Sequence, residues 1–313
     1  MTILLSLIVL FIVIFAALFG FTAFVAGKVE KALPPRGRFV DIGGDRLHYV
    51  EQGSGPVILM VHGLGGQLLN FAYLPMQELA RSHRVILIDR PGSGYSVRGA
   101  QSSATIVNQA ATVAAFIKAL KLDKPLLVGH SLGGAIALAV GLNHPQSISR
   151  LALIAPLTHT QSAPPEPFRG LMITSSLLRR MIANTLATPL SIKKGAETLA
   201  FVFGPEPVPK DFRTKGGGLL GLRPHSFYSA SSDMIATADD LPTMETRYAT
   251  LQMPIDVLYG KQDQILDYRQ HGEALKQKVP RAVLTLVDGG HMLPVTVPAL
   301  TAKWLLAIAD GAA

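Results

Sequence analysis

The stretch VGHSLGGAIALAV, residues 128–140, decides the fold, because an apolar strand-like run turns there into an alanine-rich helical run. Ser131 stands at the junction in the pattern G-x-S-x-G, with Gly129 and Gly133 on either side. A nucleophilic serine on a strand-to-helix turn needs such small neighbours, because the turn is tight and carries the hydroxyl above the edge of a sheet. The start of the following helix also points N–H groups at this position, which favours a developing negative charge. We therefore expect Ser131 to be a nucleophile.

Around this stretch, apolar strand-like runs alternate with helical patterns from residue 56 onward. Such alternation predicts an α/β fold with a mostly parallel sheet covered by helices on both faces. Two short strands joined at Gly43 and Gly44 precede it and are typical of a hairpin. The alternation stops over residues 157–253, which are rich in proline, serine and threonine, and then resumes. We interpret this segment as an insertion over the carboxyl ends of the strands, where ligands bind in open α/β sheets.

The N-terminal segment has a different character, because no residue from Thr2 to Gly27 is charged. A helix needs about 20 apolar residues to cross the hydrocarbon core, so this segment is long enough to span with some tilt. The competing interpretation is a cleaved signal peptide, which would begin with basic residues and have a shorter apolar run. Since neither is present, we predict an uncleaved single-pass anchor.

Four basic residues follow the apolar run closely, namely Lys28, Lys31, Arg36 and Arg38. The positive-inside tendency would place the following domain on the cytoplasmic side. The same side chains could instead contact anionic lipid headgroups. The predicted organisation is therefore an anchor at 1–27, a linker at 28–38, the first part of the core at 39–156, the insertion at 157–253 and the second part of the core at 254–313.

Composition excludes several classes of function. The formal net charge of +8 is scattered along the chain, without a basic run, so we expect no nucleic-acid partner. The chain has no cysteine, which excludes disulfides, thiol nucleophiles and cysteine-ligated metal sites. No pair of histidines has metal-ligand spacing, and no G-x-G-x-x-G opens a helix. We therefore expect neither a metal nor a cofactor.

A serine hydroxyl needs a base within hydrogen-bond reach and an acid that orients that base. His291 follows the last predicted strand, and Asp263 follows the strand before it, so both lie at the same edge of the sheet as Ser131. The chain order Ser, Asp, His is the one expected for this architecture. The roles would be nucleophile, orienting acid and general base. The weaker candidates for the acid are Asp256, inside a strand, Asp267, further along the chain, and Asp288, in the turn before His291.

The oxyanion of an acyl-transfer reaction needs two N–H donors. The backbone of Leu132, directly after the nucleophile, supplies one. We assign the other to the backbone of Leu64, in the turn after an earlier strand, where Gly63 allows a close approach. We expect His62 to brace this loop by hydrogen bonding. His130 receives no catalytic role, because neighbouring side chains on a strand point in opposite directions.

Together these motifs make the chain resemble the α/β-hydrolase fold family over about residues 39–310. The resemblance rests on VHGLGG, DRPGSGYS, VGHSLGG, YGKQD and GGHMLP. It implies a mostly parallel eight-stranded sheet with a helical cap, here residues 157–253, over the active site. It also implies Ser131, Asp263 and His291 as a catalytic triad, with Leu64 and Leu132 as oxyanion donors. In the dehalogenases and epoxide hydrolases of the family the nucleophile is aspartate, so the serine argues against both.

The expected activity is hydrolysis of a small-molecule carboxylic ester through an acyl-enzyme, without a cofactor. Apolar stretches in the insertion and the membrane anchor suggest a hydrophobic, lipid-soluble substrate. Serine hydrolases of this fold also cleave carbon–carbon bonds, lactones or amides, or act as perhydrolases, and the sequence does not separate these reactions. A non-catalytic binding protein is the other alternative. It predicts a broken triad, and none of the three positions is broken.

Overall fold

The computed structural model describes residues 2–311. Eight strands form one sheet in the order β1-β2-β4-β3-β5-β6-β7-β8. β2 pairs antiparallel with β1 and with β4, and every other neighbouring pair is parallel, as the alternation of strands and helices predicts. The strands are β1 (Arg38–Ile42), β2 (Asp45–Gln52), β3 (Val57–Val61), β4 (Arg84–Ile88), β5 (Leu126–His130), β6 (Arg150–Ile154), β7 (Ile255–Gly260) and β8 (Val283–Val287).

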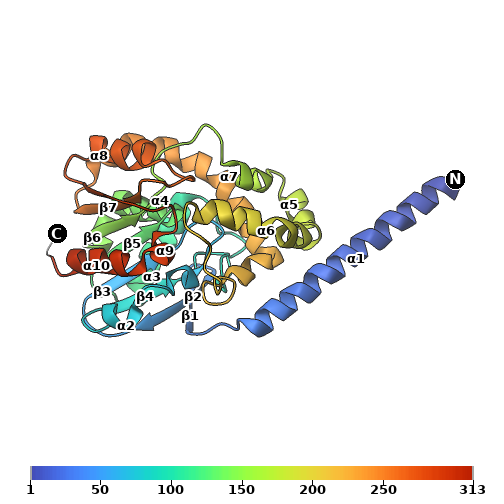
Figure 1. Cartoon of the computed structure of the whole chain (residues 1–313), viewed down its shortest axis with the longest axis horizontal. Helices are drawn as coiled ribbons and strands as arrows, with labels where there is room; N and C mark the ends of the chain where they lie inside the picture. The colour runs from blue at the N-terminus through green and yellow to red at the C-terminus, as the bar shows by residue number, and fades with distance from the viewer. Residues whose placement is uncertain (1, 312–313) are drawn as a thin grey trace.

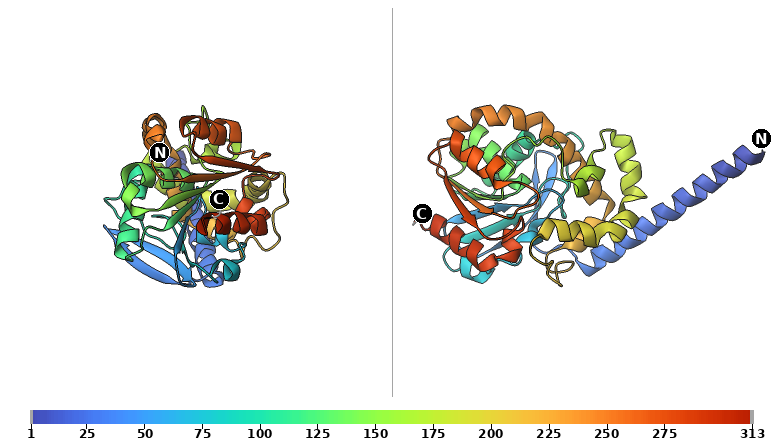
Figure 2. Two further views of the ribbon diagram at one scale, coloured as in Figure 1. Left: turned by 90° about the vertical axis from the view of Figure 1, so that its left-hand side faces the viewer. Right: turned by 45° about the horizontal axis from the view of Figure 1, so that its top comes forward.

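Helices cover both faces of this sheet (Figure 2). Side chains alternate along each strand, so Leu59 and Val61 enter the core cluster that contains residues of α3 and α4. Ile58 and Met60 enter the cluster on the opposite face, which contains residues of α10. The core helices are α2 (Met76–Leu79), α3 (Ile106–Ala119), α4 (Leu132–Asn143), α8 (Ala274–Lys278), α9 (Leu293–Thr296) and α10 (Pro298–Ala309). The buried sheet holds the strand ends, and with them the candidate site, in fixed positions.

The segment between β6 and β7 carries three longer helices, as the break in the alternation suggests. These are α5 (Ser176–Asn184), α6 (Ala187–Phe203) and α7 (Pro224–Arg247); a short 3-10 turn, η3 (Glu166–Leu171), precedes α5, and another, η4 (Gly218–Leu222), lies between α6 and α7. α5 and α6 lie on the side of the body that is nearest to α1 (Figures 1 and 2). We call residues 157–253 the insertion.

Helix α1 (Thr2–Ala32) projects away from the body (Figure 1). Among residues 2–311 it is the one helix that is long and apolar enough to cross a membrane. It continues to Ala32, so the first five residues of the predicted linker, 28–32, are helical. No helix-breaking residue occurs before Pro34, which explains why the helix does not stop at Gly27.

Candidate active site

Ser131 occupies a strained turn between β5 and α4. Its φ of 54° and ψ of −120° place a residue other than glycine in a sparsely populated conformation. A Cβ on Gly129 would lie 2.4 Å from the carbonyl oxygen of Gly133, and one on Gly133 would lie 2.2 Å from that of Val61. The two glycines of the motif are therefore required by the backbone packing around the turn. The strain at Ser131 is the kind of feature that active sites retain.

Asp263 and His291 are brought together from the loops after β7 and β8. The Nδ1–H of His291 donates to Asp263 Oδ2 at 2.7 Å. Asp263 Oδ1 accepts from the backbone N–H groups of Ile265 and Leu266 at 2.8 and 3.0 Å. Both side chains are buried. With the proton fixed on Nδ1, the lone pair of His291 lies on Nε2, which is the arrangement a general base needs.

Ser131 and His291 line the same cavity, together with Gly63, Leu64 and Leu132. Between the described side chains of Ser131 and His291 there is no hydrogen bond, whereas His291 and Asp263 are joined. The structure thus places the predicted nucleophile, base and both oxyanion residues around one space. Of the weaker acid candidates, Asp288 is exposed and pairs with Lys261 at 3.3 Å, on the surface.

The loop after β3 approaches Ser131 closely. A Cβ on Gly63 would lie 2.9 Å from Ser131 Cβ, so only glycine lets this loop close on the serine. His62 is completely buried and bonds through Nδ1 to the carbonyl of Gly63 at 2.9 Å, while its Nε2 accepts from the N–H of Arg90 at 3.0 Å. Burial lowers the pKa of His62 well below its ordinary value, so it stays neutral. Its two hydrogen bonds fix the loop, in the way the sequence suggests.

Arg90 lies next to the site, and the sequence gives no indication of its contacts. Its Nε and Nη2 donate to the carbonyls of His62 and Gly63 at 3.0 and 2.9 Å. Its Nη1 donates at 2.7 Å both to Asp233, on α7 of the insertion, and to Gln109. Arg90 and Asp233 are completely buried. The DRPGSG motif by itself suggests only a tight turn. The partner of the arginine lies 143 positions later in the chain, so no local pattern indicates the contact.

His130 is a second residue whose contact in the site the sequence does not indicate. Its Nε2–H donates to the backbone carbonyl of His291 at 3.0 Å, and the two rings lie 5.0 Å apart. Burial is the largest cause that lowers the pKa of His130 to about 3, so the ring is neutral at ordinary pH. His130 lines the same cavity as Ser131. The loop after β8 folds over the end of β5, so the His130 ring contacts His291 and its hydrogen bond supports that loop.

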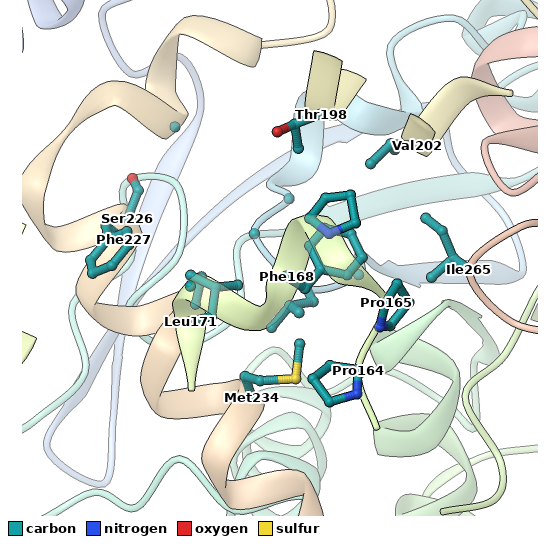
Figure 3. A pocket seen from close by; sticks show the side chains of 18 of the residues that line it. Pro164, Pro165, Phe168, Leu171, Thr198, Val202, Ser226, Phe227, Met234 and Ile265 are labelled. Carbon is teal, nitrogen blue, oxygen red and sulfur yellow. The ribbon is translucent and has the colours of Figure 1, made fainter. Parts of the chain in front are cut away.

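The cavity has a volume of about 930 Å³. Most of its wall comes from the insertion, and Figure 3 shows Phe168, Leu171, Val202 and Met234 around it, with Ile265 from the loop after β7. The apolar stretches around 170–178, 198–203 and 216–222 all contribute lining residues. They therefore do more than pack the insertion against the sheet. A space of this size with a largely apolar wall is typical of small-molecule binding sites.

A sheet of this topology, with a serine on the turn after β5 and an Asp–His pair after β7 and β8, defines a hydrolase of the α/β type. Comparison with protein families agrees, because residues 56–297 match the alpha/beta hydrolase fold family. The chain belongs to this family.

Similar proteins include lipases and carbon–carbon hydrolases. Monoacylglycerol lipase ABHD6 of Mus musculus is 26% identical over 81% of this chain and 75% of its own length. A 2-hydroxymuconate semialdehyde hydrolase of Pseudomonas sp. (strain CF600) is 37% identical over 39% of this chain and 44% of its own. An acetyltransferase component of the acetoin cleaving system of Pseudomonas putida is 37% identical, and the match spans only 36% of that protein.

Among solved structures, a membrane phospholipase A, described as a bacterial virulence factor, has the same fold with a TM-score of 0.69. It is 26% identical to this chain, and the match covers 99% of this chain and 98% of the phospholipase. The similarity thus includes the region of α1.

Proposed function

We propose that this protein is a membrane-anchored serine hydrolase that cleaves a carboxylic ester with a long apolar group. The observation that carries the proposal is the Asp263–His291 pair, joined at 2.7 Å, whose histidine lines the same cavity as the strained turn of Ser131. The similarity to a monoacylglycerol lipase and to a membrane phospholipase A supports an ester as the substrate.

In the proposed reaction, His291 Nε2 takes the proton of Ser131 as its Oγ attacks the ester carbonyl. The N–H groups of Leu64 and Leu132 stabilise the resulting oxyanion. The carbon–oxygen bond to the alcohol then breaks, and His291 returns the proton to the leaving alcohol. Water attacks the acyl-enzyme with His291 again as the base, which releases the carboxylic acid and restores Ser131. Asp263 stabilises the imidazolium that forms twice in this cycle.

The proposal also assigns roles to the insertion and to helix α1. The insertion acts as the cap over the reactive groups, which is supported by its large share of the cavity wall. Helix α1 anchors the enzyme, and Lys28 and Lys31 at its end favour the cytoplasmic side for the catalytic body.

Labelling with a fluorophosphonate tests whether the serine is activated. We expect the full-length protein to be labelled and the Ser131→Ala variant to be unlabelled. Ser191→Ala is the matched control, because Ser191 also lines the cavity but lies on α6, in the insertion. Absence of labelling in the folded wild-type protein would favour a binding protein without chemistry.

A substrate panel separates the reactions open to this fold. Nitrophenyl esters of increasing chain length should be hydrolysed with a preference for the longer acyl groups, because the cavity wall is largely apolar. A lactone and a dienol-ketone belong in the same panel, since the match to 2-hydroxymuconate semialdehyde hydrolase makes carbon–carbon cleavage the second candidate. Faster turnover of the dienol-ketone than of any ester would replace the ester proposal.

A further inference from the structure

Exposed apolar side chains outside α1 are concentrated in one part of the insertion. Among residues 2–311, twelve large hydrophobic side chains outside α1 are exposed, and seven of them fall between residues 172 and 192. The other five are scattered singly over the body, as on most soluble surfaces. The seven are Met172, Leu177, Leu178, Met181, Leu186, Leu190 and Ile192. We call the part of this region formed by α5, α6 and their connection the α5–α6 corner.

The α5–α6 corner is in direct contact with the anchor. The hydroxyl of Thr22, which is buried although it belongs to α1, donates to the backbone carbonyl of Thr185 at 3.0 Å. Thr185 connects α5 to α6, and α1 packs against both helices. Figures 1 and 2 show α1 passing this side of the body as it leaves. The corner therefore lies beside a helix that is long and apolar enough to cross a bilayer.

The body is also fixed to the end of α1, so it cannot swing freely about a linker. Arg223, from the insertion, lies 3.8 Å from Glu30 on α1. The hydroxyl of Tyr95 donates to the carbonyl of Leu33, and His48 bonds through Nε2 to the carbonyl of Arg36 at 2.7 Å. The depth of α1 in a bilayer therefore determines which part of the body meets the lipid.

Helix geometry gives that depth. From Thr2 to Thr22 an α-helix rises about 30 Å, at 1.5 Å per residue, which equals the thickness of the hydrocarbon core, about 30 Å. With Thr2 at the opposite boundary of the hydrocarbon core, Thr22 lies at the near boundary, or inside the core when α1 tilts. Thr185 lies at the same level because the two residues are hydrogen-bonded. The exposed side chains of Leu186 and Met181 next to it then face lipid.

The same corner borders the cavity. Leu186 and Leu190 are 44% and 48% exposed, yet both also line the space that contains Ser131 and His291. An apolar wall that is shared between the outer surface and the cavity gives an apolar ligand a path between them. Lys193 and Lys194, which follow Ile192 and are exposed, are placed to meet anionic headgroups.

We propose that the α5–α6 corner is a second membrane contact, seated in the leaflet from which α1 emerges, and that a lipid ester enters the cavity through it. The occupant of this apolar surface is the lipid bilayer. The entry of the ester rests on the proposed function, whereas the membrane contact does not.

Site-specific fluorescence tests the contact directly. The chain has no cysteine, so one introduced cysteine can be labelled cleanly with an environment-sensitive fluorophore. The full-length Leu177→Cys and Leu300→Cys variants are reconstituted in vesicles of phosphatidylethanolamine and phosphatidylglycerol. Leu177 lies on α5 and Leu300 on α10, away from α1, and both are exposed. We expect lipids that are spin-labelled on the acyl chain to quench the label at 177, and aqueous iodide to quench the label at 300.

Equal iodide quenching at both positions, without lipid quenching at 177, would overturn the contact. The membrane contact would also be overturned if a second copy of the chain covered the surface at Leu177. Unlabelled Leu177→Cys would then form a disulfide-linked dimer. Because quenching requires no turnover, the same result is expected in a Ser131→Ala background. A failed fluorophosphonate reaction thus counts against the proposed function alone.

Activity tests the path of entry. The double variant Leu177→Asp and Leu178→Asp changes the corner outside the cavity lining, so hydrolysis of a water-soluble nitrophenyl butyrate in detergent should stay unchanged. Hydrolysis of a long-chain ester embedded in vesicles should fall about tenfold, because two apolar side chains are replaced by charged ones at the lipid boundary. Leu300→Asp is the matched control and should leave both rates unchanged. An unaltered vesicle rate in the double variant would overturn entry through the corner.

Discussion

Arg90 and Asp233 form a completely buried ion pair at 2.7 Å that joins the loop after β4 to helix α7 of the insertion. The same guanidinium holds the carbonyls of His62 and Gly63, next to the proposed oxyanion donor Leu64. One side chain therefore connects the insertion to the loop that carries this proposed donor. A second arginine, Arg98, also pairs with Asp233, so two guanidinium groups share one carboxylate.

Removing one partner of this pair should destabilise the protein strongly. Asp233→Asn leaves Arg90 buried without its counter-charge, and such changes typically cost about 3–5 kcal/mol of unfolding free energy. Denaturant unfolding of the full chain in detergent measures this loss. Arg269→Ala is the control, since Arg269 is exposed and its contact with Asp267 is 3.8 Å long. We expect that variant to change the unfolding free energy by less than about 1 kcal/mol. Similar losses in both variants would contradict the assignment.

Asp263→Asn should reduce kcat by about four orders of magnitude, because the amide no longer fixes the proton of His291 on Nδ1 or stabilises the imidazolium. The rate of nitrophenyl ester hydrolysis measures the effect. Asp267→Asn and Asp288→Asn remove two of the three carboxylates that were weaker candidates for the acid. Both variants should keep nearly full activity, and a large loss in either one would move the acid role away from Asp263.

Gly63→Ala should reduce kcat with little effect on KM. The new Cβ would lie 2.9 Å from Ser131 Cβ, and so it pushes the Leu64 N–H out of line with the oxyanion. Loss of one oxyanion donor costs about 10²–10³-fold in kcat. Gly170→Ala serves as the control, because a Cβ there meets no atom within 4 Å. A rise in KM with unchanged kcat would show that this loop only binds substrate.

Stability should fall on acidification. Burial is the largest cause that lowers the pKa of His130 to about 3 and of His271 to about 4, from an ordinary value of 6.5. The unfolded chain therefore binds more protons than the folded one below about pH 6.5. The contribution is complete above this pH and is lost as the pH falls towards the folded pKa values.

The measurement is the unfolding free energy as a function of pH between about 4 and 7. Each buried histidine contributes a slope of up to about 1.4 kcal/mol per pH unit. His130→Gln retains an N–H donor but cannot be protonated in this range, so its slope should be shallower. His144→Gln, at the partly exposed end of α4, should keep the wild-type slope. An unchanged slope in His130→Gln would remove this histidine from the explanation.

Local patterns predicted a large part of this structure. The strand, glycines and helix around Ser131 are contiguous, so the turn is visible in a short stretch of sequence. The positions of Asp263 and His291 follow from counting strands, because parallel strands end at one edge. The contacts of Arg90 with Asp233 and of His130 with His291 depend instead on how distant segments pack. No pattern within one stretch encodes them, and the same holds for the contact between Thr22 and Thr185.

The wall of the cavity and its reactive groups come from separate lengths of chain: residues 157–253 supply most of the lining, while the turn at Ser131 and the loops at Asp263 and His291 belong to the sheet. Mutations in the lining can therefore alter which molecules the cavity accepts while the proposed catalytic groups stay in place. Natural selection can change the substrate range through one continuous segment, residues 157–253, while the groups on the sheet stay the same.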